Sequence, residues 1–192
     1  VVPYARGAET VVAGIARDLG LRADGMKGRL PADVQPIGRA RVAVYKPWTA
    51  SIDEGWTRLV LDRFEFTYDV VTDAQVRAGN LRARYDAIVL PNVPGDRVAS
   101  GMSDETVPPE YAGGLGAAGM DALGAFVRTG GTLICLGQSS GLAIGMFELP
   151  VRDTARQSER LFVPGSILRL TLDPAHPLAF GIPDETTAFF AF

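Results

Sequence analysis

Cysteine and histidine are almost absent from this chain of 192 residues, and each shortage excludes a kind of chemistry. The single cysteine, Cys135, excludes a disulfide within the chain. The single histidine, His176, is too few for a zinc site, which takes three or four protein ligands. No spaced group of carboxylates suggests another metal. We therefore expect neither a metal nor a cofactor in this chain.

Basic stripes and long apolar runs are also missing. The net charge is −3, whereas nucleic-acid binding calls for a basic stripe or face. No apolar run approaches the roughly 20 residues of a membrane span. The sequence thus predicts neither a nucleic-acid partner nor a membrane-spanning segment.

Short apolar runs alternate with helix-like segments over most of the chain. Strands are expected to begin at four residues, Arg41, Tyr68, Tyr85 and Thr132. Helices are expected at 53–64 and 119–128. Strands that alternate with helices favour a parallel sheet covered on both faces. We therefore predict an α/β fold, a three-layer, doubly wound, mostly parallel sheet of the flavodoxin-like type.

Other segments carry less regular signals. Residues 92–117 read as a long loop, and 161–163 and 166–172 as later strands.

In the helix 53–64 the large apolar side chains recur at helical spacing and are expected to face the sheet. They are Trp56, Leu59, Val60 and Phe64. Of the two tryptophans, Trp56 is expected in the core, and Trp48, in a loop, at a pocket or interface.

Two domain segments are expected. Residues 1–40 form a lead-in helix and a connector rich in glycine and proline, and residues 41–192 form the α/β domain. The chain starts without Met and stops in the apolar stretch 188–192. We expect it to be a piece of a longer protein.

The stretch 130–141 is a strand followed by a sharp turn into a helix. Such turns lie at the carboxyl edge of an open sheet, where ligands bind. Cys135, Ser139 and Ser140 are therefore the nucleophile candidates of this stretch. The ligand-binding candidates at this edge are Trp48, Asn92, Gln138, Ser139 and Ser140.

Two glycine patterns have catalytic or cofactor counterparts. Gly137-x-Ser139-x-Gly141 matches a hydrolase nucleophile elbow, which needs a later acid, Asp153 or Glu159, and then His176. Gly114-x-Gly116-x-x-Gly119 has the spacing of a dinucleotide fingerprint but does not follow a strand. The second pattern is better explained as close packing of a loop before a helix.

Ile134-Cys135-Leu136-Gly137 resembles the elbow of class I glutamine amidotransferases. That family pairs its cysteine with a His-Pro-Glu sequence, whereas the stretch 176–178 here is His-Pro-Leu. The loop 91–94, where the family has glycines, is Pro-Asn-Val-Pro, and proline has no N–H to donate. We therefore expect Cys135 to be buried and inert. The alternative is a thiol- or serine-dependent amidase or hydrolase that uses Cys135 or Ser139 with His176.

Five stretches together resemble the amidotransferase-like domain that follows the catalytic domain of bacterial carboxypeptidase A-type zinc peptidases. They are 41–58, which contains Pro-Trp-Thr-Ala-Ser, 113–116, 130–133, 163–169 and 173–181. The resemblance implies a non-catalytic accessory domain whose partner is an upstream peptidase domain, with zinc held only there. It is compatible with a homo-oligomer and with a secreted or periplasmic parent protein, but it does not fix the compartment.

Overall fold

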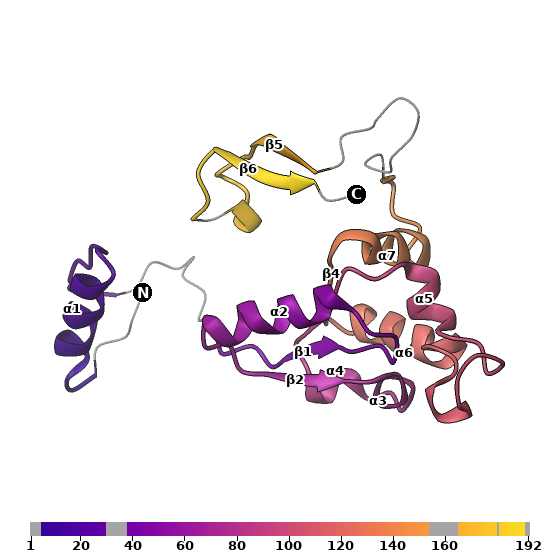
Figure 1. The fold of residues 1–192 in the computed structure, drawn as a ribbon. Coiled ribbons are helices and arrows are strands. Elements are labelled where there is room, and N and C mark those ends of the chain that lie inside the picture. Colours follow the sequence, from indigo (N-terminus) through magenta and orange to yellow (C-terminus); the bar gives the residue numbers. More distant parts are fainter. Residues whose placement is uncertain (1–4, 30–37, 154–164, 180, 191–192) are drawn as a thin grey trace. The chain divides into compact units, whose positions relative to one another are not determined.

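The computed structural model describes residues 5–29, 38–153, 165–179 and 181–190 (Figure 1). The chain divides into two units, Val1–Arg39 and Ala40–Phe192. Within the first unit, helix α1 (Ala8–Asp18) is amphipathic but buries none of its residues. Among the described residues, no helix is both long and apolar enough to cross a membrane.

Four strands of the second unit form one parallel sheet in the order β2-β1-β3-β4. The strands are β1 (Val42–Tyr45), β2 (Tyr68–Val71), β3 (Ala87–Leu90) and β4 (Thr132–Cys135). Every neighbouring pair runs parallel, with Val42 opposite both Tyr68 and Ala87, and Ala87 opposite Thr132. The predicted parallel, flavodoxin-like sheet is confirmed, since 2-1-3-4 is the strand order of that fold.

Helices cover both faces of this sheet. The helices are α2 (Ile52–Arg63), α3 (Asp73–Arg77), α4 (Leu81–Arg84), α5 (Gly95–Ser100), α6 (Gly116–Arg128) and α7 (Ser140–Met146). Right-handed crossovers place α2 on one face and α3, α4 and α6 on the other (Figure 1). The described residues also form three single turns of 3₁₀ helix, η1 (Pro109–Tyr111), η2 (Gly137–Ser139) and η3 (Pro177–Ala179).

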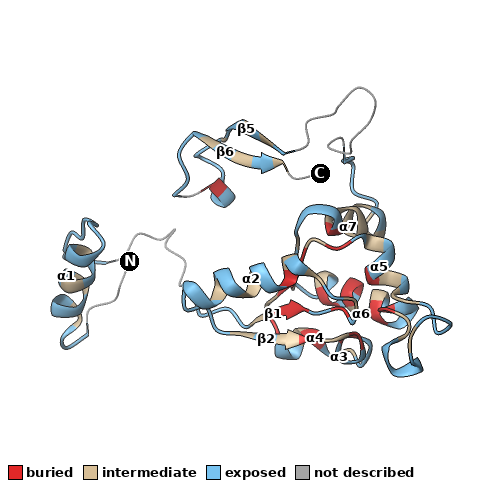
Figure 2. Ribbon diagram, viewed as in Figure 1, coloured by how far each residue is buried: buried red, intermediate tan, exposed pale blue. Residues whose placement is uncertain are grey.

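The hydrophobic core lies between the sheet and α6. Figure 2 shows the buried residues gathered in the strands and in α6. Leu123 and Phe126 of α6 are buried, and Met120 and Val127 pack partly buried against the same cluster. The α6 face of the sheet is therefore the well-covered one.

Helix α2 turns its apolar side outward, opposite to the prediction. The large apolar residues of this segment are each more than half exposed: Trp56, Leu59, Val60 and Phe64. The buried position is Glu54, whose carboxylate lies 2.7 Å from the guanidinium of Arg58. The expectation that these four side chains face the sheet was wrong. Helical spacing shows which side chains share one face of a helix, but it does not show what that face packs against.

The segment 92–117, expected to be one long loop, contains short regular elements. It contains α5 and η1, and Met102 pairs with Gly113 in an antiparallel bridge. At Gly101 a side chain would overlap the carbonyl of Gly113, and φ is +66°. A glycine there lets the two backbone segments approach closely.

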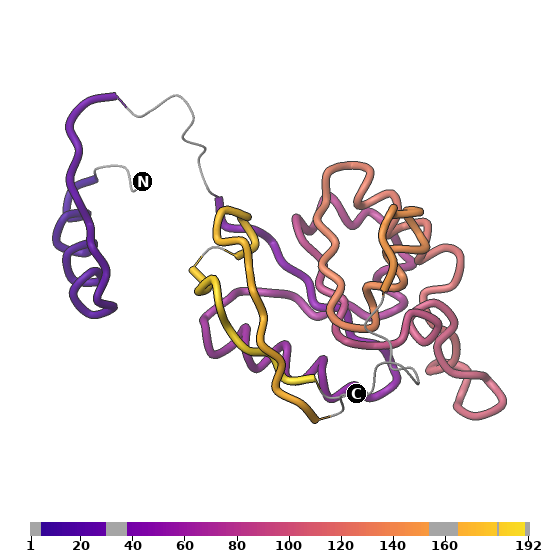
Figure 3. Tube along the Cα trace, turned by 90° about the horizontal axis from the view of Figure 1, so that it is seen from above, coloured from indigo at the N-terminus to yellow at the C-terminus, as the bar shows by residue number. Residues whose placement is uncertain are grey.

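The C-terminal region contains an antiparallel hairpin of β5 (Ser166–Thr171) and β6 (Glu185–Phe190), whose strands run side by side in Figures 1 and 3. This confirms the strand expected at 166–172. The strand expected at 161–163 and the acid candidate Glu159 lie outside the described residues.

Candidate functional site

Three loops meet at the carboxyl edge of the sheet. They follow β1, β3 and β4, which are neighbours, so the segments after Tyr45, Leu90 and Cys135 lie close together. The strand order reverses between β1 and β3. Ligands in open α/β sheets bind at such a switch point.

Asn92 ties these loops together. Its Nδ2 donates to Asp53 Oδ2 at 3.1 Å, and its Oδ1 accepts from the backbone N–H of Gln138 at 2.8 Å. Gly137 adopts φ +55°, and a side chain there would overlap the Asn92 amide. One side chain thus joins the end of β3 to the start of α2 and to the turn after β4.

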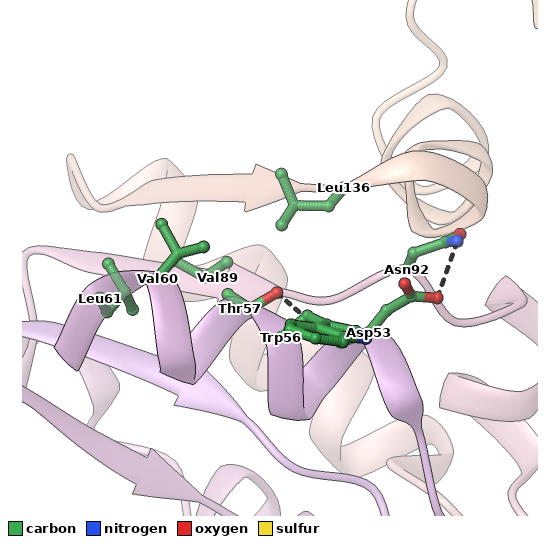
Figure 4. A pocket seen from close by; sticks show the side chains of 8 residues that line it. All are labelled: Asp53, Trp56, Thr57, Val60, Leu61, Val89, Asn92 and Leu136. Carbon is green, nitrogen blue, oxygen red and sulfur yellow. Dashed lines mark hydrogen bonds between the residues drawn. The ribbon is translucent and has the colours of Figure 1, made fainter. Parts of the chain in front are cut away.

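Two cavities lie on either side of this Asn92–Asp53 bridge. The larger, about 450 Å³, is drawn in Figure 4 and is mostly apolar; it is lined by Asp53, Trp56, Thr57, Val60, Leu61, Val89, Asn92 and Leu136. The smaller, about 290 Å³, is lined by Thr49, Ala50, Ser51, Ile52, Asp53, Asn92, Val93, Pro94 and Arg97. Asp53 and Asn92 line both. Trp56, expected in the core, instead lines the larger cavity, because α2 turns its apolar side outward.

Cys135 ends β4 with its side chain half-buried against the core cluster. Desolvation raises the pKa of its thiol to about 11, and a hydrogen bond with Ser139 opposes that rise only in part. A cysteine nucleophile needs its thiolate at neutral pH, which a cation, a helix N-terminus or a histidine supplies. Residues 38–153 contain no histidine, so none of them can serve Cys135 as an imidazole base.

The hydroxyls of Ser139 and Ser140, in the turn after β4, form hydrogen bonds with backbone carbonyls. Ser139 is fully buried, and its Oγ lies 2.8 Å from the carbonyl oxygen of Leu136 and 3.2 Å from that of Leu90. Ser140 Oγ donates to the carbonyl of Gly137 at 2.7 Å. Both hydroxyls stabilise the turn, whereas an elbow serine presents its Oγ to the substrate.

His176 lies in the turn that leads into η3. Its Nδ1 accepts from the N–H of Leu178 at 3.2 Å, and its backbone bonds to Asp173 and Ala179. Within the described residues its hydrogen bonds therefore stay inside its own turn. Nor do the described residues contain a group of three His, Cys, Asp or Glu side chains that could hold a metal ion.

Trp48 follows β1 and is half-exposed. Its ring meets Tyr111 edge to face, with centroids 4.9 Å apart and planes at 74°. It lines neither of the two cavities. The structure thus brings Asn92 and the backbone of Gln138 together, but only Asn92 lines the cavities, and Trp48 contacts the segment around η1 instead.

Sequence reasoning missed most of the apolar lining of the larger cavity. Trp56, Val60 and Leu61 were expected to face the sheet or were not singled out. A clue was available in Glu54 and Arg58, an oppositely charged i,i+4 pair on the side of α2 opposite its apolar residues. The pair can neutralise itself and be buried, which leaves the apolar side free.

Comparison with known proteins identifies no family. No family model matches the chain, and no curated protein matches it. Among solved structures it is similar to a protein from Bacteroides uniformis described as ThuA-like, with 11% sequence identity and a TM-score of 0.44. The match covers 84% of this chain and 62% of that one. The flavodoxin-like assignment rests on the strand order of this chain, not on that likeness.

Proposed function

We propose that this chain is a non-catalytic α/β domain that serves as an accessory module of a zinc carboxypeptidase. The observation that carries the non-catalytic part is the environment of Cys135. Its thiol is desolvated, its pKa is raised to about 11, and the neighbouring hydroxyl of Ser139 is bonded to backbone carbonyls. A site so arranged lacks an activated nucleophile at neutral pH.

The loop after β3 supports the same proposal. In amidotransferase-type sites, backbone N–H groups near the nucleophile stabilise the oxyanion. Here that loop begins Pro91-Asn92-Val93-Pro94, and the Asn92 side chain is engaged by Asp53 and Gln138. The loop contributes to rigidity, and the carboxyl edge offers two shallow cavities for a ligand or partner.

The carboxypeptidase part of the proposal rests on the sequence resemblance, above all on Pro-Trp-Thr-Ala-Ser at 47–51. In this proposal the peptidase domain of the same polypeptide holds the zinc and cleaves the peptide. The present domain supports that domain, or binds a ligand or partner beside it.

An activity comparison tests the non-catalytic part. The purified chain and its Cys135→Ala variant are assayed for glutamine hydrolysis and for hydrolysis of activated esters and amides. We expect both to give the same rate as buffer. Turnover that Cys135→Ala or His176→Ala abolishes, without loss of folding, would establish the thiol or serine hydrolase instead.

A second experiment tests the accessory part. The coding DNA that flanks this segment is sequenced, and the purified chain is analysed for zinc. We expect an upstream reading frame with the histidines and glutamate of a zinc carboxypeptidase, and no stoichiometric zinc in this chain. A frame without such residues, or zinc bound through Cys135 and His176, contradicts the proposal.

A further inference from the structure

The smaller cavity at the carboxyl edge has one basic and one acidic side chain in its wall. Arg97 comes from α5, which follows β3, and Asp53 comes from the first turn of α2, which follows β1. The two charges thus belong to the two loops of the switch point, between which open α/β sheets bind their ligands.

Neither of these charges is fully used inside the chain. Asp53 Oδ2 accepts from Asn92 (Figure 4), but Asp53 Oδ1 has no hydrogen-bond partner among the described residues. The guanidinium of Arg97 forms no hydrogen bond or ion pair with the part of the chain that the structure describes, Asp53 included. Two opposite charges therefore line one small cavity without neutralising each other, which leaves both for a ligand.

Both side chains extend from backbone that is held in place. Asp53 is fixed by its hydrogen bond from Asn92 at 3.1 Å. Arg97 precedes Val98, which is fully buried and whose carbonyl accepts from the N–H of Leu115 at 2.9 Å. The cavity is therefore largely pre-formed, as sites for small molecules usually are.

The rest of the lining suits a short organic ligand. Thr49 and Ser51 contribute hydroxyls, and Ser51 Oγ accepts from the N–H of Glu54 at 3.2 Å, so its own hydrogen remains available to a ligand. Val93 and Pro94 add apolar wall. The volume of about 290 Å³ is small for a ligand pocket, since such pockets typically measure about 300–1,000 Å³.

We propose that this cavity binds a free amino acid with an apolar side chain. The ligand's carboxylate pairs with Arg97, whose guanidinium matches a carboxylate in shape, and its ammonium group pairs with Asp53. Its side chain packs against Val93 and Pro94. A phosphate ester suits the cavity less well, because it brings no cation and Asp53 repels it.

This proposal names the ligand of the carboxyl edge and rests on the accessory function proposed above, since a carboxypeptidase releases free amino acids. The probe is L-leucine, titrated into the purified chain in a calorimeter, and we expect saturable binding of one molecule per chain. Leucinamide keeps the ammonium group but lacks the carboxylate, and 4-methylpentanoate keeps the carboxylate but lacks the ammonium group. Each analogue should bind about tenfold or more weakly, because each loses one charge-assisted hydrogen-bonded pair.

Matched variants locate the site. Arg97 and Arg63 are both exposed, but only Arg97 lines the cavity. We expect Arg97→Gln to weaken the binding of L-leucine about tenfold or more, and Arg63→Gln, which changes the net charge equally, to leave it unchanged. Asp53→Asn keeps an oxygen that accepts from Asn92. It should weaken L-leucine but not 4-methylpentanoate, which has no ammonium group. Circular dichroism checks that each variant is folded.

Three outcomes overturn the proposal. Without saturable binding at millimolar L-leucine, the cavity is no amino-acid site. If either analogue or inorganic phosphate binds as tightly as L-leucine, recognition does not use both charges. If Arg97→Gln leaves the affinity for L-leucine intact, the ligand binds elsewhere on the chain. Each of these outcomes leaves the non-catalytic domain standing, whereas turnover that depends on Cys135 would overturn that function whatever the cavity binds.

Discussion

Tyr45 and Asp73 form a buried polar pair within the core. The hydroxyl of Tyr45 donates to Asp73 Oδ1 at 2.5 Å and joins the end of β1 to the start of α3. Both residues are almost fully buried. A carboxylate in that position depends on its donor, because an unsatisfied buried polar group costs about 1–3 kcal/mol.

Tyr45→Phe should therefore lower the free energy of unfolding by about 1–3 kcal/mol. The control is Tyr68→Phe, which removes a hydroxyl that donates to the exposed side chain of Asp62 at 2.9 Å and should cost much less. Urea denaturation at neutral pH measures both. Equal losses in the two variants would contradict the buried role of the Tyr45 hydroxyl.

Asp73 should also shape the pH dependence of stability. Burial raises its pKa above the usual value, while the Tyr45 hydrogen bond and the charge of Arg77 oppose the rise. The folded state then binds more protons than the unfolded state between the unfolded and folded pKa values. Stability from this group is present below the unfolded pKa and is lost as pH rises through the folded one.

Asp73→Asn should remove that loss. The asparagine keeps an oxygen that accepts from Tyr45 but cannot ionise. Relative to the wild type, the variant should gain stability as pH rises from about 4, near the unfolded pKa of aspartate, to neutrality. Urea midpoints of both proteins across that range measure the difference. A difference that stays constant with pH would show that Asp73 titrates normally.

At the scale of elements, the turn after β4 depends on Asn92 and Gly137. The Asn92 amide occupies the space that a side chain at Gly137 would need, and φ at Gly137 is +55°. Gly130 also has a positive φ, +89°, but no atom lies within 4 Å of the position of an added Cβ. Substitutions at the two glycines therefore distinguish the cost of backbone strain, which both share, from the cost of steric overlap, which only Gly137 has.

Gly137→Ala should destabilise the domain by roughly 1–3 kcal/mol more than Gly130→Ala, the usual cost of overpacking. The measurement is the free energy of unfolding of each variant by urea. If the two variants lose equal stability, Asn92 moves aside easily, and the turn is not fixed by this contact.

Sequence patterns predicted the positions of the strands better than they predicted which side of helix α2 is buried. The apolar runs at β1, β3 and β4 are short and flanked by helices, which leaves a parallel sheet as the main solution, and that solution was found. The buried side of α2 was mispredicted, because burial of Glu54 depends on its pairing with Arg58 and on tertiary packing. The same limit hid the apolar lining that Trp56 and Val60 give to the larger cavity.

Part of the candidate site, the meeting of Asn92 and Gln138, could be predicted from the sequence. Asn92 and Gln138 follow strands, and parallel strands bring their carboxyl ends to one edge, so the meeting of these residues was foreseeable. The hydrogen bonds of Ser139 and Ser140 to backbone carbonyls depend on the exact path of the turn. No sequence pattern specifies that path.

At the scale of the whole molecule, the domain has the sheet, the switch point and the turn of an α/β enzyme. The described part around Cys135 lacks the base that would activate a thiol, and its two cavities are bridged by the Asn92–Asp53 pair. Fold alone does not imply function, which depends on the groups placed at the site. Our central proposal is that this fold acts here without covalent chemistry.

The rate at which iodoacetamide alkylates native Cys135, measured across pH, tests this claim most directly. The rate follows the thiolate, so it should rise with an apparent pKa of about 11, stay below that of the unfolded chain at neutral pH, and be unchanged in His176→Ala. A fast rate with a plateau near neutral pH that His176→Ala abolishes would contradict the account, because it would reveal a working thiol–imidazole pair.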